Sequence, residues 1–385
     1  MIRDKMDIEE ILLKRLKKRE NQGNLRDLYT SQGLVDFVSN DYLGLARSVE
    51  LQSRINRKTS EGKQFLNGAT GSRLLSGNTR EAEDLESYLA HVFRAPGALL
   101  FNSGYVANLA LLSAVPQKND TIIYDEYIHA CIKEGARLSL ANRFTFRHND
   151  LNDLESKLTK ASGSIFVVVE SVYSMDGDFC PLEAILEVSK KYGANVIIDE
   201  AHSTGILGER GCGFACSMNL ENEIFARVYT FGKAMGVHGA CIVGSKSLRD
   251  YLINFARPFI YTTALPPHSI VAIRESFGYL IDNMSLQSEL EQRITFFKNR
   301  IKEELKDNRD VRLIESSSAI QAIIYPGNKR VRQVAKQINE QGFDVRPILS
   351  PTVKEGAERL RLCLHTYNTT EQIEGVIKST VKSLS

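Results

Sequence analysis

Short apolar runs alternate with helical patterns through the middle of the chain. Most of these runs are continuously apolar, as expected for strands that are buried on both faces of a sheet. The predicted strands cover residues 98–101, 121–124, 144–146, 165–169, 196–198, 227–231 and 240–243. Helical patterns between them cover residues 81–92, 107–114, 129–140 and 181–192. This alternation predicts an α/β fold, with a mostly parallel sheet that is covered by helices on both faces.

The pattern changes after Pro266 and Pro267. A long helical stretch over residues 269–306 is followed by short apolar runs, and further helical patterns separate or follow these. The runs cover residues 311–314, 319–325, 343–346 and 360–364, and the helical patterns cover 329–341 and 370–384. We therefore predict an N-terminal helix and arm over residues 1–40, a large domain over 41–268 and a smaller α+β domain over 269–385.

Composition narrows the class of protein. The chain has 385 residues, of which 43% are hydrophobic and 25% charged, as in ordinary globular proteins. Its 49 basic and 47 acidic residues nearly cancel, which gives no reason to expect a nucleic acid or a membrane surface as partner. Six scattered cysteines without a CxxC pair predict reduced thiols and no metal site. A charged N-terminus and the lack of a long apolar stretch predict a soluble, cytoplasmic protein.

Lys233 offers the most informative chemistry, because it follows a predicted strand and lies in a glycine-rich turn. A strand-end lysine with small neighbours can reach a flat, bulky cofactor and form an imine with it. Asp199 ends another predicted strand and can pair with the nitrogen of a pyridine ring. Together the two residues favour a pyridoxal phosphate (PLP) enzyme, since strand-end carboxylates of α/β sheets line binding sites. Either residue alone would suggest a surface lysine or an unrelated buried aspartate.

Three further segments follow predicted strands. Ser103 and Gly104 open a helix, where backbone N–H groups can bind phosphate, although glycine often only turns the chain. His129 could stack on a pyridine ring, or it could be structural. Ser174 could hydrogen-bond a phenolic oxygen of the cofactor, or it could belong to a tight turn at Asp176 and Gly177.

Arg359 and Arg361 lie on one face of the predicted strand that begins near residue 360. An arginine binds a carboxylate through two parallel hydrogen bonds, and amino-acid substrates carry a carboxylate. Exposed arginines are also common on strands, so the pattern alone leaves both interpretations open.

The chain resembles the α-oxoamine synthases, a PLP-dependent family with the aspartate-aminotransferase-like fold, called fold type I. The resemblance extends from about Val38 to the C-terminus. It rests on the segments around Gly104, His129, Ser174, Asp199 and Lys233, and on residues 39–44, 71–77 and 261–267. These motifs occur in the family's order, which makes the resemblance specific.

The resemblance implies a cofactor role for each matching residue. Lys233 would link covalently to PLP and later act as the base that transfers a proton. Asp199 would pair with the ring nitrogen, and His129 would stack on the ring. The other implied contacts are those of His202 and Ser174 with the phenolic oxygen, and of Ser103, Gly104, Tyr105 and Thr230 with the phosphate.

Substrate and subunit contacts are implied in the same way. Asn40 and Arg361 would orient the carboxylate of the amino acid, and Thr352 would lie near the acyl group. Thr263, with Thr262, would reach the cofactor phosphate of the neighbouring subunit. The resemblance therefore implies a homodimer with active sites at the subunit interface.

Two segments, residues 318–321 and 347–353, resemble the branch of the family that acts in biotin biosynthesis. That branch condenses L-alanine with a pimeloyl thioester, carried on CoA or an acyl-carrier protein, and releases CO2. The alternatives within the family are the glycine C-acetyltransferase and serine palmitoyltransferase branches. An alternative of another class is a catalytically silent partner subunit, but Lys233 and Asp199 are both present.

Three questions stay open at this point. The loop at residues 67–72 has fewer glycines than the family often has, which leaves the accepted acyl length undetermined. Arg26 is the nearest match for an N-terminal arginine that contacts substrate in some members, but the first 37 residues align loosely. A nucleotide-binding dehydrogenase is disfavoured, because Gly211-Cys212-Gly213 lacks the third glycine of a GxGxxG motif.

Overall fold

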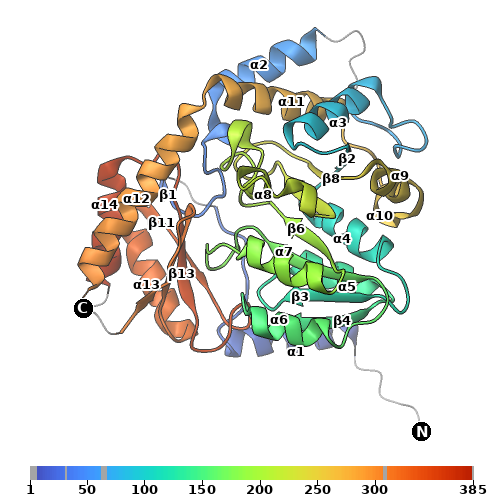
Figure 1. Cartoon of the computed structure of the whole chain (residues 1–385). Coiled ribbons are helices and arrows are strands. Elements are labelled where there is room, and N and C mark those ends of the chain that lie inside the picture. The colour runs from blue at the N-terminus through green and yellow to red at the C-terminus, as the bar shows by residue number, and fades with distance from the viewer. Residues whose placement is uncertain (1–6, 31–32, 62–66, 307–309, 384–385) are drawn as a thin grey trace. The chain divides into compact units, whose positions relative to one another are not determined.

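Figure 1 shows a computed structural model of the protein, which describes residues 7–30, 33–61, 67–306 and 310–383. The chain forms two compact units. The large unit comprises Asn40–Gln292 and His365–Tyr367. The small unit comprises Met1–Ser39, Arg293–Leu364 and Asn368–Ser385.

A seven-stranded sheet forms the centre of the large unit, in the order β2-β8-β7-β6-β5-β3-β4. Its strands are β2 (Gly97–Phe101), β3 (Thr121–Asp125), β4 (Asn142–Phe146), β5 (Ile165–Glu170), β6 (Asn195–Asp199), β7 (Ala226–Thr230) and β8 (Ala240–Gly244). Strand β8 pairs antiparallel with β2 and β7, and all the other neighbours pair in parallel. The predicted mostly parallel sheet is confirmed.

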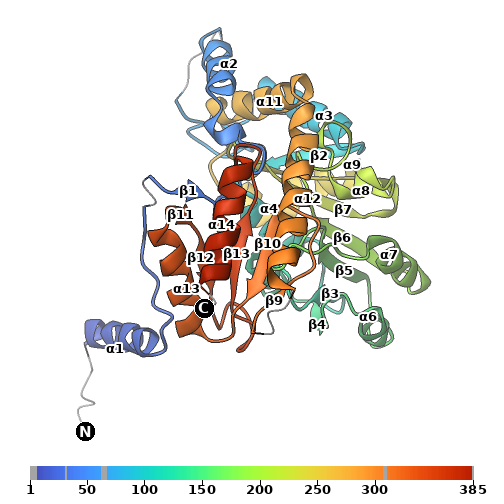
Figure 2. The same ribbon diagram turned by 90° about the vertical axis from the view of Figure 1, so that its left-hand side faces the viewer.

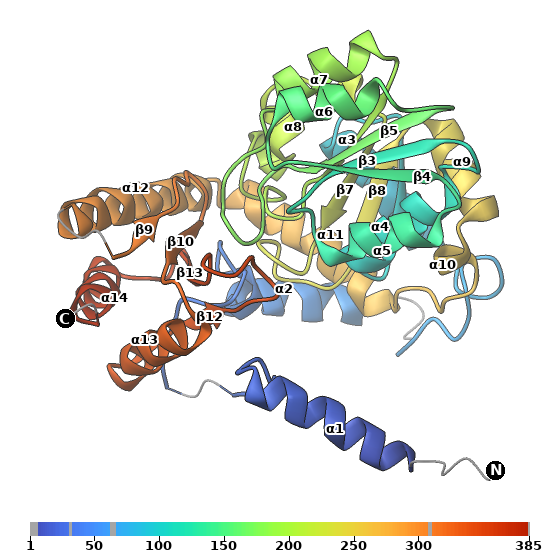
Figure 3. The same ribbon diagram turned by 90° about the horizontal axis from the view of Figure 1, so that it is seen from below.

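Both faces of this sheet are buried, which explains the continuous apolar runs of the strands. Within β5, Phe166 and Val168 point into a core with α4 (Gly104–Ala114) and α5 (Ala130–Leu138). Their neighbours Val167 and Val169 point into a second core with α6 (Leu151–Leu158) and α7 (Leu182–Lys191). Figure 3 shows the sheet between these two layers of helices.

Three of the remaining helices of the large unit, α2, α3 and α9, begin after a capping side chain. Ser48, Thr79 and Ser245 each accept a hydrogen bond from a backbone N–H of the first turn. The helices are α2 (Val49–Ser60), α3 (Arg80–Val92), α8 (Phe214–Ser217), α9 (Lys246–Phe255), α10 (Arg257–Ile260) and α11 (Pro267–Asp282).

The single helical stretch expected at residues 269–306 is two helices, α11 and α12 (Ser285–Leu305), because the chain leaves the helix at Asn283. Helix α11 packs against α2 and α3. The expected domain boundary at residue 268 therefore falls inside the large unit, and the arm that was expected over residues 1–40 belongs mainly to the small unit.

The small unit has an antiparallel sheet in the order β12-β13-β10-β9 and a parallel pair of β1 with β11. The strands are β1 (Val35–Asp36), β9 (Arg312–Leu313), β10 (Ile320–Ile324), β11 (Phe343–Asp344), β12 (Arg346–Ile348) and β13 (Arg359–Cys363). Figure 2 shows α13 (Asn328–Glu340) and α14 (Thr370–Lys382) alongside these strands. Helix α1 (Ile8–Asn21) has no buried residue.

Two features bear on the environment of the protein. Across the described ranges, no helix combines the length and the apolar character that a bilayer crossing requires. All six cysteines are buried, and none of them forms a disulfide in the described part of the chain.

Candidate active site

Strands β2, β3, β5, β6 and β7 run in the same direction, so their carboxyl ends meet at one edge of the sheet. In open α/β sheets, ligands bind beyond this edge. The segments that follow these strands carry the residues predicted from the sequence, namely Ser103, Gly104, His129, Ser174, Asp199, His202 and Lys233. The fold therefore gathers residues that are far apart in the chain at one edge.

Lys233 ends a chain of hydrogen bonds that reaches into the protein. Its Nζ lies 2.8 Å from Nε2 of His202, and Nδ1 of His202 lies 2.8 Å from the Tyr42 hydroxyl. The Tyr42 hydroxyl donates to Oδ1 of Asn40 at 2.9 Å. Because an amide oxygen only accepts, Tyr42 must take its own hydrogen bond from Nδ1–H of His202. This leaves the lone pair of His202 Nε2 to accept from Lys233.

The Asp199 carboxylate is buried and held by two donors. Its Oδ2 accepts from the side-chain amide of Asn108 at 2.7 Å, and its Oδ1 accepts from the backbone N–H of Ala201 at 2.8 Å. Asn108 lies one helical turn after Gly104 and also donates to the backbone carbonyl of that residue at 3.1 Å. The buried Oδ1 of Asn108 has no partner within the described part of the chain.

Gly104 lies at a tight approach between two segments. A Cβ at this position would lie 1.9 Å from Oγ1 of Thr230, so no other residue fits without a shift. Ser103 caps α4 by accepting from the backbone N–H of Val106 at 3.3 Å. The N–H groups of Gly104 and Tyr105 precede the first intrahelical bond and have no acceptor among the described residues. The Tyr105 hydroxyl donates to Glu134.

His129 caps α5 through its ring, because Nδ1 accepts from the backbone N–H of Cys131 at 3.2 Å. Its side chain is exposed at the sheet edge. The protein atoms around it and the charge of Lys233 lower the pKa of His129, while Asp199 opposes this shift. The ring is therefore neutral near pH 7, with its hydrogen on Nε2.

Glu170, the last residue of β5, is fully buried next to the same group of charges. Its carboxylate accepts a hydrogen bond from the backbone N–H of His129. Burial and the negative charge of Asp199 raise the pKa of Glu170 to about 8. The charges of Asp199 and Lys233 act on both Glu170 and His129, which places all four groups in one site.

Two other predicted segments lie in the large unit. Ser174 is buried, and it does belong to a tight turn, in which the N–H of Gly177 donates to the carbonyl of Tyr173 at 2.8 Å. Thr262 and Thr263 lie against the turn before α4, where the Asn102 amide donates to Thr262 Oγ1 at 3.3 Å and to the Thr263 carbonyl at 3.0 Å.

The remaining predicted residues lie in the small unit. Arg361 lies on β13, paired with Ala322 of β10 and Arg346 of β12. Thr352 is exposed and lines a pocket with about 780 Å³ of empty space, and Arg26 lines the same pocket. The roles of Arg361 and Thr352, and that of Asn40 toward substrate, remain predictions from the sequence.

Three residues of the site were not predicted from the sequence: Tyr42, Asn108 and Glu170. Each lies inside a segment that carried the family resemblance. Asn108 could have been found from its spacing, because the fourth residue after a helix start returns to the face of Gly104. No sequence pattern indicates that Tyr42 meets His202, since 160 residues separate them.

The geometry fits PLP. The Gly104 turn offers unpartnered N–H groups and the Thr230 hydroxyl to a phosphate, where a side chain on residue 104 would fill the space. His129 offers a neutral, exposed ring to a flat ligand, and Asp199 offers a fixed carboxylate to a ring nitrogen. Lys233 supplies the amine that PLP chemistry requires.

Comparison with known proteins agrees with this geometry. Residues 32–379 match the family described as aminotransferase class I and II. The curated 8-amino-7-oxononanoate synthase of Emericella nidulans is 38% identical over an alignment of 394 positions, which spans 97% of this chain and 95% of that protein.

Solved structures extend the agreement to the fold. The 8-amino-7-oxononanoate synthase of Francisella tularensis superposes with a TM-score of 0.79 at 30% identity, covering 92% of this chain and 98% of that one. A serine palmitoyltransferase of S. paucimobilis with bound PLP gives a TM-score of 0.86 at 26% identity, covering 98% of both chains. The fold is therefore fold type I of the PLP-dependent transferases. The chain belongs to the aminotransferase class I and II family, and within it to the PLP-dependent α-oxoamine synthases that include 8-amino-7-oxononanoate synthase.

Proposed function

We propose that the protein condenses L-alanine with a pimeloyl thioester to give 8-amino-7-oxononanoate, CO2 and the free thiol, as a step of biotin biosynthesis. The observation that carries this proposal is the convergence of Lys233, Asp199, His129 and the Gly104 turn at one sheet edge, in a chain 38% identical to an 8-amino-7-oxononanoate synthase. Loss of CO2 makes the condensation hard to reverse.

PLP, when bound, supplies an electron-withdrawing ring that stabilises negative charge on the carbon next to the substrate nitrogen. The backbone N–H groups of Gly104 and Tyr105, with Thr230, hold its phosphate. His129 holds the flat face of the ring, and Asp199 holds the ring nitrogen in its protonated form, because an ion pair away from water favours both charges. Ser174 would orient the phenolic oxygen, and His202 would lie beside it.

Lys233 is the residue that moves a proton. Its Nζ, as a free amine, would accept the proton from the α-carbon of alanine. His202 Nε2, at 2.8 Å, holds the lysine amine in position, and the Tyr42 hydroxyl fixes the tautomer that makes this possible. This chain of hydrogen bonds therefore fixes the direction in which the Lys233 amine points.

We further propose that the acyl donor binds in the small unit. Arg26 and Thr352 line one pocket, and a guanidinium there can bind the far carboxylate of a pimeloyl group. This supports a substrate role for Arg26, which the sequence left open.

We also propose a homodimer in the cytoplasm. Large apolar side chains are exposed in the segments around the site, including Leu74, Leu75 and Tyr261, at 50%, 84% and 75% exposure. Such a concentration is typical of a surface that another chain covers. Six buried cysteines that form no disulfide in the described part of the chain fit a reducing compartment. Light scattering of the purified protein checks the dimer.

A substrate matrix tests the reaction. Alanine, glycine and serine are each paired with pimeloyl-CoA, acetyl-CoA and palmitoyl-CoA, and the products are identified by mass spectrometry. We expect 8-amino-7-oxononanoate from alanine and pimeloyl-CoA as the fastest reaction, and none from Lys233→Ala. A faster reaction of glycine with acetyl-CoA, or of serine with palmitoyl-CoA, would assign the protein to another branch. No product from any pair, in a protein that binds PLP, would favour a silent partner subunit.

A further inference from the structure

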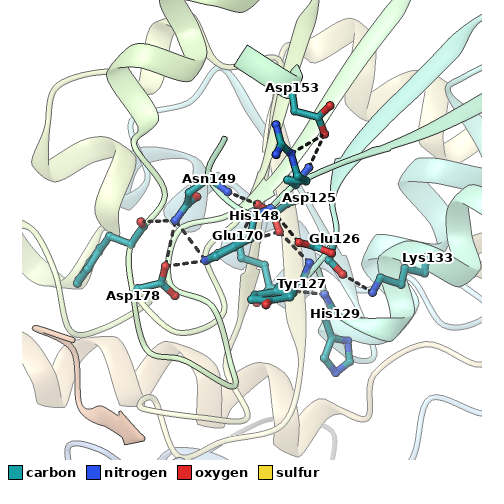
Figure 4. A network of polar contacts seen from close by, with 12 residues as sticks. Asp125, Glu126, Tyr127, His129, Lys133, His148, Asn149, Asp153, Glu170 and Asp178 are labelled. Atoms are coloured by element: carbon teal, nitrogen blue, oxygen red, sulfur yellow. Dashed lines mark hydrogen bonds and ion pairs between the residues drawn. The ribbon is translucent and has the colours of Figure 1, made fainter. Parts of the chain in front are cut away.

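His148 lies two residues after β4 and is held from both sides by carboxylates (Figure 4). Its Nδ1 lies 3.0 Å from Oδ1 of Asp125, at the end of β3, and its Nε2 lies 2.7 Å from Oδ2 of Asp178. Asp125 is fully buried, and the His148 side chain is 17% exposed. Nothing in the proposed reaction uses this cluster, which lies behind the turn that carries His129.

The arrangement requires a charged ring. An ionised carboxylate only accepts hydrogen bonds, so both ring nitrogens of His148 must carry hydrogen. Burial alone would lower the pKa of His148, but its hydrogen bonds to Asp125 and Asp178 outweigh burial and raise the pKa to about 9. The ring is therefore an imidazolium at neutral pH, with no lone pair to offer a metal ion, although His148, Asp176 and Asp178 lie within 4.8 Å of one another.

Asp125 connects this cation to the turn between β3 and α5. Its Oδ1 accepts from the backbone N–H of Tyr127 at 2.8 Å, and its carbonyl accepts from Ile128 N–H at 3.2 Å. The Tyr127 ring stacks on the His148 ring, with centroids 4.5 Å apart and planes 23° apart. The turn is thus fixed by hydrogen bonds on one side and by ring contact on the other.

His129 follows directly after this turn. Lys133 donates to the carbonyl of Glu126 at 2.7 Å, which ties the first turns of α5 back to the same segment. Glu170 accepts from the backbone N–H of His129. The position of the His129 ring is therefore set by the two ends of the turn, and His148 holds the first of them (Figure 4).

We propose that His148, as an imidazolium between Asp125 and Asp178, is a positioning residue that holds the His129 ring against the cofactor. Side chains in a functional site are precise only when their supporting contacts are themselves fixed. Without the cation, two carboxylates would face each other in a partly buried space, and one of them would have to turn away or take up a proton. Either change would release the backbone of Tyr127 and so move His129. The inference rests on the proposed PLP-binding function.

The test uses the holoenzyme and the variants His148→Gln and Asp178→Asn, with His91→Gln as the matched control, because His91 is an exposed histidine at the end of α3. The readouts are the dissociation constant for PLP, the visible circular dichroism of bound PLP, and kcat and KM for alanine. We expect His148→Gln to weaken PLP binding and kcat roughly 10-fold, within the range that a small misplacement produces. The dichroism band should shrink, while KM for alanine changes little.

Asp178→Asn should give a smaller change of the same kind, because His148 still has its hydrogen bond to Asp125. In the wild type, the dichroism band should also fall as the pH rises through about 9, where His148 loses its proton, and this step should be missing in His148→Gln. The titratable groups that face His148 are Asp125, Glu126, Tyr127, Tyr173, Asp176 and Asp178. His91→Gln should match the wild type in every readout.

A folded His148→Gln protein with unchanged dichroism, PLP affinity and pH profile would overturn the inference. If that variant does not fold, Asp178→Asn decides, and wild-type behaviour of Asp178→Asn overturns it equally. Stoichiometric Zn²⁺ binding that is lost in His148→Gln would assign a metal site in its place. Failure of the wild type itself to bind PLP would refute the proposed function, so the two failures are distinguishable.

Discussion

The Tyr42 hydroxyl lies 2.8 Å from Nδ1 of His202 and fixes which nitrogen of that ring carries the hydrogen. Tyr42 is 1% exposed, so water does not replace its hydroxyl if it is removed. In Tyr42→Phe, the Nδ1–H of His202 is left without its acceptor, and the tautomer that receives Lys233 loses its advantage. An unsatisfied buried donor costs about 1–3 kcal/mol.

We therefore expect Tyr42→Phe to lower kcat about 10-fold, with KM for alanine nearly unchanged, since about 1.4 kcal/mol corresponds to a factor of ten. Steady-state kinetics measure this split. Tyr192→Phe is the control, because its hydroxyl bonds only Glu155, at 3.3 Å and away from the site. Equal kcat values for the two variants would show that the tautomer of His202 does not matter.

Gly104→Ala should abolish PLP binding at micromolar concentration. The new methyl group would lie 1.9 Å from Oγ1 of Thr230, which must move out of the phosphate site. Gly278→Ala is the matched control, because nothing lies within 4 Å of a Cβ there and alanine favours the interior of α11 by about 0.5–1 kcal/mol. Absorbance titration with PLP separates the two. If Gly104→Ala bound PLP with wild-type affinity, the phosphate could not bind at this turn.

Asn108→Ala should lower kcat clearly while changing the free energy of unfolding little. The substitution removes the donor at 2.7 Å from Asp199 Oδ2, so the carboxylate is less firmly held toward a ring nitrogen. Removing one hydrogen bond to a charged group costs about 1.5–3 kcal/mol, which corresponds to a loss of about 10- to 100-fold in kcat. Kinetics at saturating PLP measure the effect, and a kcat within twofold of the wild type would show that Ala201 alone holds Asp199.

The stability conferred by His148 should fall as the pH rises. Its folded pKa of about 9 lies above the unfolded value of 6.5, so the native state keeps the proton longer. The contribution is complete below pH 6.5 and lost as the pH passes 9, and the shift corresponds to about 3 kcal/mol. Urea unfolding of the wild type and His148→Gln at pH 6 and pH 9.5 tests this. The difference between the two proteins should shrink at the higher pH.

Glu170 acts in the same direction, since its raised pKa makes the native state hold a proton above pH 4.5. Its contribution is present in both proteins and cancels in the difference. A difference between wild type and His148→Gln that is constant with pH would mean that His148 carries no charge in the native protein.

Local pattern was enough to predict the sheet and the strand ends, because a strand that is buried on both faces leaves a continuous apolar run. Asp199 was found for that reason, because a carboxylate at the end of such a run is conspicuous, and Gly104, His129 and Lys233 lie in the short segments that follow other runs. The break between α11 and α12 could not be found in this way. Both halves have helical periodicity, and only the structure shows that the first half packs against α2 and α3.

Contacts between segments that are far apart in the chain could not be predicted from local sequence patterns either. His148 follows an edge strand with mostly exposed residues, and nothing near it in sequence shows that Asp178, 30 residues later, completes its surroundings. Tyr42 and Asn108 lie in segments that carried the family resemblance, but the fold determines which residues they contact.

The reversed direction of β8 has a consequence for how the protein matures. Because β8 pairs antiparallel with both β2 and β7, those two strands run in the same direction and end at one edge, where Gly104 lies close to Thr230, 126 positions later in the chain. We therefore expect the phosphate site to form only after β8 has been synthesised and has paired with both β2 and β7. Binding of PLP would then be a late step of folding, and the growth of its absorbance would follow completion of the sheet.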